Sequence, residues 1–225
     1  FRYNGGGSVQ TAAYLGSMIT GQFTGEIYSK IFHNENLQSS DRNYLFTNSI
    51  EGGGSINSVN LSKIYVLTTN RRTASASELV INSLKPYIDV IVIGENTVGK
   101  TQASITIYDS PTPYTSQNVN LSHTYAMQPL IANSTNVNDQ LVPTEGIVPD
   151  FDVTEAASTL RILGSIEEPL LFTAISDILG TGRPLNQIYN ERPLISTNTI
   201  FHEDDVESIL TFMIKVLDFN GFDLR

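Results

Sequence analysis

The chain has 225 residues, of which 40% are hydrophobic and 16% charged, a composition typical of a globular protein with a sizeable core. It contains no cysteine, which excludes disulfides, thiolate metal sites and a cysteine nucleophile. With 13 Lys and Arg against 23 Asp and Glu, its net charge of −10 is unfavourable for binding nucleic acid, so we expect no nucleic-acid partner.

The first residues, Phe1 to Asn4, resemble the end of a strand that enters a glycine turn rather than a natural start. We therefore expect the chain to be a fragment of a longer protein, in which case the lack of a signal peptide says nothing about location. No apolar run approaches the roughly 20 residues that a transmembrane helix needs.

A helix and several strands are predicted in the first 70 residues. The helix begins after Ser8, a favourable N-cap residue, and its apolar residues recur at helical spacing up to about Gly21. Strand-like segments follow at residues 26–33 and 43–47. Residues 63–69 are rich in β-branched and aromatic side chains, which predicts another strand.

The middle of the chain has the pattern of a βαβ unit. After the strand at residues 63–69, residues 75–85 are predicted to form a helix that ends before Pro86, and residues 88–93 a buried strand. A strand, a helix and a second strand at this spacing usually form a parallel pair. The sequence therefore predicts an α/β fold with a partly parallel sheet flanked by helices.

Additional strands are expected at residues 103–108 and 124–131. A further helix is predicted to begin at Ser165 or Glu168 and to continue to Leu179, because a proline lies at its start and a glycine just after its end.

The last part of the chain differs from the rest. Residues 181–203 are irregular, whereas the segment from Asp204 to Gly221 carries an apolar stripe and begins with acidic residues, which predicts an amphipathic helix. We therefore expect a core over residues 1–180 and a C-terminal extension over residues 181–225.

Ser75 is the first residue that can carry chemistry. It lies where the predicted strand at residues 63–69 leads into the helix, next to the unpaired N–H groups of the helix start. The Ala76 N–H is then suitably placed to stabilise an oxyanion formed when Ser75 attacks a carbon. The alternative is that Ser75 only caps the helix, the commonest use of serine there.

Lys100 is the second such residue. It ends the segment Gly94–Lys100 and lies 25 positions after Ser75, so a helix running out and a strand running back can bring the two together. An exposed lysine, with a pKa of about 10.4, stays charged. Burial beside Ser75 disfavours the ammonium form, and Lys100 can then act as a general base. The alternative is a solvated lysine in a polar loop.

The run Gly5-Gly6-Gly7 precedes the first helix. Glycine lets backbone N–H groups approach a ligand closely, so this run can bind an oxyanion or a phosphate. Most such runs are simply turns, and this one lacks the lysine and hydroxyl residue of a phosphate-binding P-loop. We therefore expect no nucleotide cofactor.

The chain has three histidines, namely His33, His123 and His202. Only His202 has acidic neighbours, in Glu203–Asp205, and this cluster is interpreted as a helix N-terminus rather than a metal site. We therefore expect no metal.

Other charged residues lie beside Ser75. Arg71 and Arg72 can pair with a carboxylate of the chain or of a substrate. Glu78 and Glu95 are expected to orient the loops around the site.

Four segments, in order along the chain, resemble the S41 family, the C-terminal processing or tail-specific proteases. Residues 1–7 resemble the family's Asp-Leu-Arg-x-Asn-x-Gly-Gly block, and residues 73–78 its Ser-Ala-Ser-Ala-Ser-Glu nucleophile block. Residues 94–100 resemble its Gly-Glu-x-Thr-x-Gly-Lys block, and residues 146–150 its Gly-Ile-x-Pro-Asp block. The resemblance extends to about residue 180, so the core is expected to be catalytic.

This resemblance implies that Ser75 is the nucleophile, Lys100 its general base and the Ala76 N–H one donor of the oxyanion hole. The second donor is expected in the glycine block, at Gly6 first and Gly7 second. The resemblance also implies an α/β core of the ClpP/crotonase type. It implies hydrolysis of peptide bonds near protein C-termini, through an acyl-enzyme and without a metal or other cofactor.

The chain departs from the family pattern at two points. Some members carry a glutamine four residues after the lysine, which orients the amine. Ser104 occupies that position here and Gln102 lies nearby out of register, so either residue can serve. The PDZ domain that usually precedes the glycine block has no counterpart, and we expect it, if it exists, in the missing N-terminal part.

We therefore predict a serine endopeptidase with a Ser/Lys dyad that acts on peptides or proteins. The resemblance implies a bacterial cell envelope setting, either periplasmic or with a lipid anchor in the missing N-terminal part. One rival is a non-catalytic module that binds peptides or apolar ligands. Another is acyl-CoA chemistry, which rests on the fold alone. The oligomeric state stays open.

Overall fold

The structure, a computed structural model, describes residues 1–70, 72–111 and 115–181. Its helices are α1 (Val9–Thr20), α2 (Ala76–Leu84) and α3 (Pro169–Ile178), with the short 3-10 helix η1 (Gln38–Ser40). Its strands are β1 (Ile27–His33), β2 (Arg42–Leu45), β3 (Lys63–Thr68), β4 (Asp89–Gly94), β5 (Gln102–Ser104), β6 (Ile107–Tyr108), β7 (Ala126–Met127), β8 (Leu130–Thr135) and β9 (Phe151–Asp152).

The predicted βαβ unit is confirmed. Strands β3 and β4 pair in parallel from Lys63 opposite Asp89 to Thr68 opposite Gly94, and α2 connects them. Strand β9 then pairs in parallel with the end of β4. The carboxyl ends of β3 and β4 therefore lie at the same edge of this sheet, where the segments that contain Ser75 and Lys100 begin.

A second, antiparallel sheet has the strand order β2-β1-β8-β5, and β6 pairs only with β7. The single strands expected at residues 103–108 and 124–131 are each divided in two. The first becomes β5 and β6 and the second becomes β7 and β8, because the two halves pair with different partners. The predicted helix beyond residue 203 lies outside the described residues.

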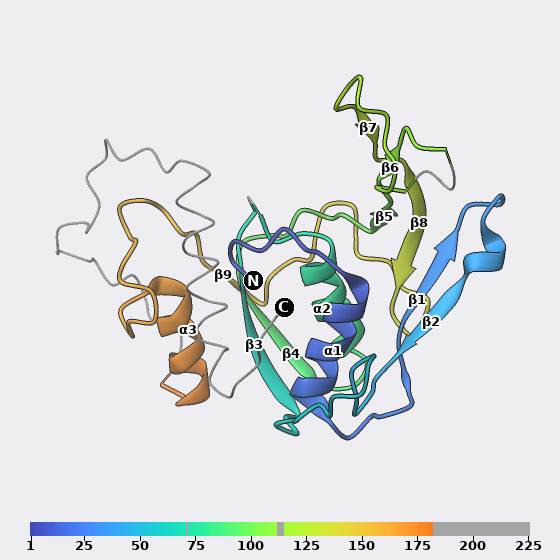
Figure 1. The fold of residues 1–225 in the computed structure, drawn as a ribbon. Helices are drawn as coiled ribbons and strands as arrows, with labels where there is room; N and C mark the ends of the chain where they lie inside the picture. Colours follow the sequence, from blue (N-terminus) through green and yellow to red (C-terminus); the bar gives the residue numbers. More distant parts are fainter. Residues whose placement is uncertain (71, 112–114, 182–225) are drawn as a thin grey trace.

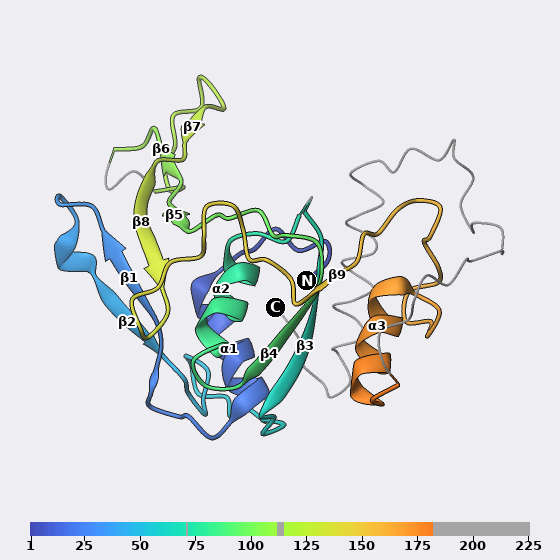
Figure 2. The same ribbon diagram turned by 180° about the vertical axis from the view of Figure 1, so that it is seen from behind.

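The elements form layers, as Figures 1 and 2 show from opposite sides. Helices α1 and α2 lie side by side between the two sheets, and α3 covers the other face of the parallel sheet. Because α2 has a sheet on either side, every residue from Ala76 to Leu84 is buried. The main core forms around α1 and α2, and a smaller one joins Ile93 to Leu170 and Ala174 of α3.

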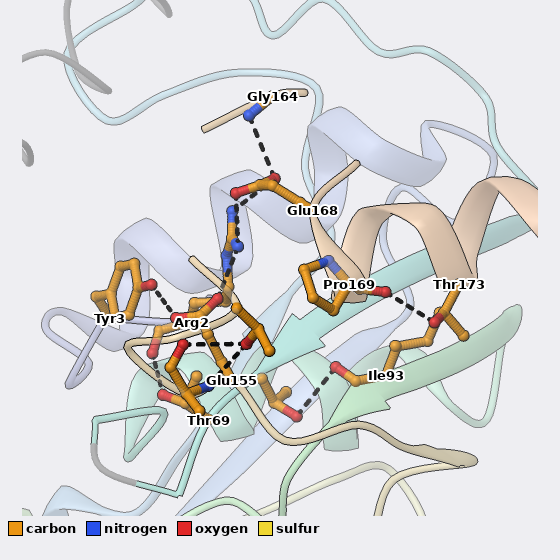
Figure 3. A network of polar contacts seen from close by, with 12 residues as sticks. Arg2, Tyr3, Thr69, Ile93, Glu155, Gly164, Glu168, Pro169 and Thr173 are labelled. Atoms are coloured by element: carbon orange, nitrogen blue, oxygen red, sulfur yellow. Dashed lines mark hydrogen bonds and ion pairs between the residues drawn. The ribbon is translucent and has the colours of Figure 1, made fainter. Parts of the chain in front are cut away.

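A buried ion-pair network links the first residues to the start of α3 (Figure 3). The Arg2 guanidinium donates to both carboxylate oxygens of Glu168, at 2.9 and 3.2 Å, and to Glu155 at 2.9 Å. The Tyr3 hydroxyl also donates to Glu155, and burial together with this carboxylate raises the pKa of Tyr3. The Thr69 hydroxyl donates to the Arg2 carbonyl, so the network reaches the end of β3.

The network gives a test of how α3 is attached. Glu168→Gln leaves Arg2 with Glu155 as its one remaining carboxylate, in a site where the Glu168 side chain is only 4% exposed. We expect the free energy of unfolding to fall by about 2 kcal/mol. The exposed neighbour Glu167 provides the control, and Glu167→Gln should change stability by less than about 0.5 kcal/mol. Urea unfolding of both variants measures the difference, and equal stabilities would contradict it.

Candidate active site

Ser75 occupies a sharp corner between strand β3 and helix α2. Its backbone angles are φ 57° and ψ −118°, a conformation that residues other than glycine rarely adopt and that requires of order 1–3 kcal/mol of support from its surroundings. The residue is the N-cap of α2, and it also lines a cleft of about 410 Å³. The capping and the chemical interpretation of Ser75 are therefore compatible.

The carboxylate of Glu78 supports this corner. Its Oε2 accepts the Ser75 N–H at 2.7 Å and the Lys100 N–H at 3.0 Å, while Oε1 accepts the Gly99 N–H at 2.6 Å and the Thr97 hydroxyl. Glu78 is completely buried, and a buried carboxylate needs such donors in place of water. One oxygen atom of Glu78 therefore fixes the backbones of Ser75 and Lys100 relative to each other, as the predicted orienting role requires.

Thr97 and Gly146 extend this support to the last of the four sequence segments. The Thr97 hydroxyl accepts the Ile147 N–H at 2.7 Å, and the Thr97 N–H donates to the Ile147 carbonyl at 3.2 Å. Gly146 has φ 85°, and a Cβ there would collide with the Thr97 carbonyl. Sequence reasoning did not single out Thr97, although its place in the segment from Gly94 to Lys100 was a signal that could have identified it.

The glycine run packs directly against the Ser75 corner. Gly6 has φ 104°, and a Cβ there would lie 2.7 Å from the Ser75 Cβ and 2.8 Å from the Ala76 nitrogen, which only glycine avoids. The Gly6 N–H, however, donates to the Asn4 side chain at 2.9 Å, and Gly6 does not line the cleft. Gly6 was the first choice as oxyanion donor, but its N–H is already paired in this structure.

Gly7 and Ala76 are two of the residues next to Ser75 that can offer backbone donors to the cleft. Both line it, and no acceptor within the described parts of the chain pairs with either N–H group. Two unpaired N–H groups beside a serine hydroxyl can stabilise negative charge on a substrate oxygen. Of the two glycines expected as the second donor, Gly7 is therefore the one whose N–H is available, and the oxyanion role of Gly7 and Ala76 stays a prediction.

Lys100 lines the same cleft as Ser75, so the predicted convergence of the two side chains on one site is observed. Of the two alternatives for Lys100, a buried and a solvated lysine, the structure shows the exposed one. Within residues 1–70, 72–111 and 115–181, no hydrogen bond joins the Lys100 amine to the Ser75 hydroxyl.

Gln102 and Ser104 both line the cleft, on strand β5 and half-buried. A register shift between Ala103 and Ser104, where β5 pairs with β8, alters the regular alternation of side chains there. Both predicted alternatives for orienting the Lys100 amine therefore remain available.

The other residues considered have structural surroundings of their own. His33 pairs with Asp41 and His123 with Asp109, and no group of three potential metal ligands occurs among the described residues. Arg72 is exposed. Arg71 and the acidic cluster at His202 lie outside the described residues.

A paired substitution tests the contact between the glycine run and Ser75. Gly6→Ala should lower the free energy of unfolding by about 2 kcal/mol or more, because it adds a clash to an unfavourable φ. Gly53, with φ 107° and no atom within 4 Å of a built Cβ, is the matched control, since Gly53→Ala brings the same strain without the clash. Thermal unfolding of both variants isolates the clash, and equal destabilisation would contradict its importance.

Glu78→Gln tests the shared anchor. The amide cannot accept as many hydrogen bonds as the carboxylate, so we expect stability to fall by about 2–3 kcal/mol. At a temperature where the variant stays folded, we also expect at least about tenfold slower modification of Ser75 by a fluorophosphonate. Glu95→Gln is the control, since among the described residues the Glu95 side chain bonds only to Asn70. Unchanged modification of a destabilised Glu78→Gln protein would show that Glu78 supports the fold alone.

Several solved structures are similar to this chain. A candidate S41 protease from Bacteroides fragilis NCTC 9343 superimposes with a TM-score of 0.68 at 27% identity, over 81% of this chain and 44% of that one. A candidate peptidase from Parabacteroides merdae ATCC 43184 gives 0.52 at 20% identity, over 80% and 51%. The photosystem II D1 C-terminal processing protease gives 0.48 at 21% identity, over 76% and 39%.

The chain thus spans about half or less of the length of these three structures. The comparison with curated proteins found no match. The sequence pattern of peptidase family S41 matches residues 1–153, which include Ser75, Lys100 and the glycine run. The chain belongs to peptidase family S41.

Proposed function

We propose that this chain carries the catalytic groups of a serine endopeptidase that acts on peptides or proteins. The observation that carries the proposal is the strained corner at Ser75, which lines a cleft and shares an anchor, Glu78, with Lys100. Membership of peptidase family S41 supports hydrolysis of peptide bonds. Cleavage near protein C-termini is a finer proposal that rests on the resemblance of the four sequence segments.

The mechanism follows from the groups around the cleft. The Ser75 hydroxyl attacks the carbonyl carbon of the scissile bond while the neutral Lys100 amine takes its proton. The N–H groups of Gly7 and Ala76 donate to the oxyanion of the tetrahedral intermediate. Lys100 then gives the proton to the leaving amine, which departs from an acyl-enzyme. Water repeats the sequence, with Lys100 as base, and releases the acid and free Ser75.

This mechanism requires water to leave the lysine. Lys100 is exposed in the chain alone, but it lines the cleft that the substrate fills. A bound peptide covers Lys100 and replaces its water, and desolvation favours the uncharged amine. Substrate binding and activation of the base are therefore the same event in this proposal.

The exposure of Lys100 also favours a second candidate, a non-catalytic module that binds peptides in the same cleft. In that case Ser75 and Lys100 would contribute polar contacts to the peptide without forming a covalent bond. Reactivity of the Ser75 hydroxyl separates the two candidates, because only the enzyme needs an activated alcohol.

The setting is proposed from the family resemblance as the bacterial cell envelope, either in the periplasm or on a lipid anchor. Among the residues that the structure describes, no helix has the length and apolar character needed to cross a membrane.

A fluorophosphonate probe tests the Ser/Lys dyad. We expect the wild-type chain to be labelled at Ser75, Ser75→Ala to be unlabelled, and Lys100→Ala to be labelled at least about a hundredfold more slowly, the usual contribution of a general base. Lys85, which is exposed and outside the cleft, provides the control, and Lys85→Ala should be labelled at the wild-type rate. Mass spectrometry of the labelled peptide measures both site and rate.

Two results would contradict the proposal. A folded wild-type chain that is not labelled would favour the binding module. Labelling of Ser75 at the same rate with and without the Lys100 amine would remove the lysine from the mechanism.

A further inference from the structure

The cleft at Ser75 differs in charge from the chain as a whole. The protein has a net charge of −10, yet none of the described Asp or Glu residues lines the cleft. The side chains there that can carry positive charge are Lys100, Arg42 and His33. A cleft lined in this way is suited to a ligand with negative charge.

Arg42 is the residue of this set that the proposed mechanism does not use. Its guanidinium lies over the Tyr44 ring, 4.8 Å from the ring centre, and Tyr44 also lines the cleft. Stacking on a ring orients the planar guanidinium while leaving its N–H donors available.

Several of the other cations are already paired with carboxylates of the chain. Arg2 is paired with Glu155 and Glu168, and Lys30 with Asp139 at 2.7 Å. Arg42 has no ion pair with any residue in the described ranges, although acidic residues outnumber basic ones in the chain. An arginine without a carboxylate, oriented at the edge of a cleft, is available to a carboxylate of the ligand.

The strand register gives the separation between the backbones of Arg42 and Thr101. Arg42 on β2 lies opposite Ile31 on β1, and Ile31 lies opposite Ser134 on β8. The Ser134 N–H donates to the Thr101 carbonyl. These four residues form a row across the sheet, and all of them line the cleft. Thr101 follows Lys100 directly. Three strand spacings of roughly 4.8 Å separate the two ends of this row, a distance of roughly 14 Å. An extended peptide spans this distance in about four residues.

We propose that Arg42 binds a carboxylate of the peptide substrate, about four residues along the peptide from the part that lies at Thr101. The term substrate rests on the proposed function, but the binding itself does not depend on catalysis. A peptide offers this chemistry in two forms, as an aspartate or glutamate side chain and as the carboxylate of its own C-terminus. Arg42 thus selects either peptides with an acidic side chain or peptides that present their own C-terminus.

The test uses the whole chain and fluorescently labelled octapeptides of alanine and serine. One set carries either glutamate or glutamine at a single position, with an amidated C-terminus. The other set is neutral throughout and ends either in the free carboxylate or in the amide. Binding is measured by anisotropy with the Ser75→Ala chain, which leaves the peptide uncut.

We expect peptides with a carboxylate to bind about tenfold more tightly than their uncharged partners. Arg42→Met in the Ser75→Ala background should abolish this preference while neutral peptides bind as before. Arg42→Lys, which keeps the charge, should restore part of it, and Lys85→Met, which removes a cation outside the cleft, should leave it unchanged. Comparing the two peptide sets tells a side-chain carboxylate from a terminal one.

The preference must disappear with Arg42 for the inference to stand. Equal binding of charged and neutral peptides by the Ser75→Ala chain, a preference that survives Arg42→Met, or no binding of any peptide would overturn it.

The proposed function is judged separately with the wild-type chain. Cleavage of neutral and acidic peptides at equal rates would overturn only the role of Arg42. Binding that depends on Arg42, in a chain that neither cleaves peptides nor reacts with the fluorophosphonate, would overturn only the proposed endopeptidase activity.

Discussion

The whole site depends on one buried carboxylate. Glu78 is buried between two sheets and has no ion pair with any residue in the described ranges, and its carboxylate accepts hydrogen bonds from donors in two separate segments of the chain. Removing such a group from water is unfavourable unless every oxygen finds donors. The loop after β4 must therefore close onto the start of α2 for the core to form, and the arrangement of Ser75 and Lys100 is a result of that closure.

The local pattern of the sequence was sufficient to predict most of the fold that presents the site. The βαβ unit followed from strand and helix periods, and Ser75 at its corner followed from the strand that ends just before it. The exposure of Lys100 and the pairing of Gly6 could not be predicted in this way. They depend on which atoms from distant segments cover or contact those residues, which local periodicity does not encode.

The set of residues from the antiparallel sheet that lines the cleft was beyond sequence reasoning for a related reason. Arg42, Ile31 and Gln102 belong to three strands whose order in the sheet differs from their order in the chain. A shift of one residue in any pairing would turn the corresponding side chain to the other face. Only the register of the assembled sheet shows that these side chains face the same space as Ser75.

The ion pair between Arg2 and Glu168 joins residues 166 positions apart. All of the chain between these two residues must therefore be synthesised before the contact can form. Closing so long a loop is slow compared with forming α2 locally. The attachment of α3 to the first residues is therefore expected to be a late step of folding.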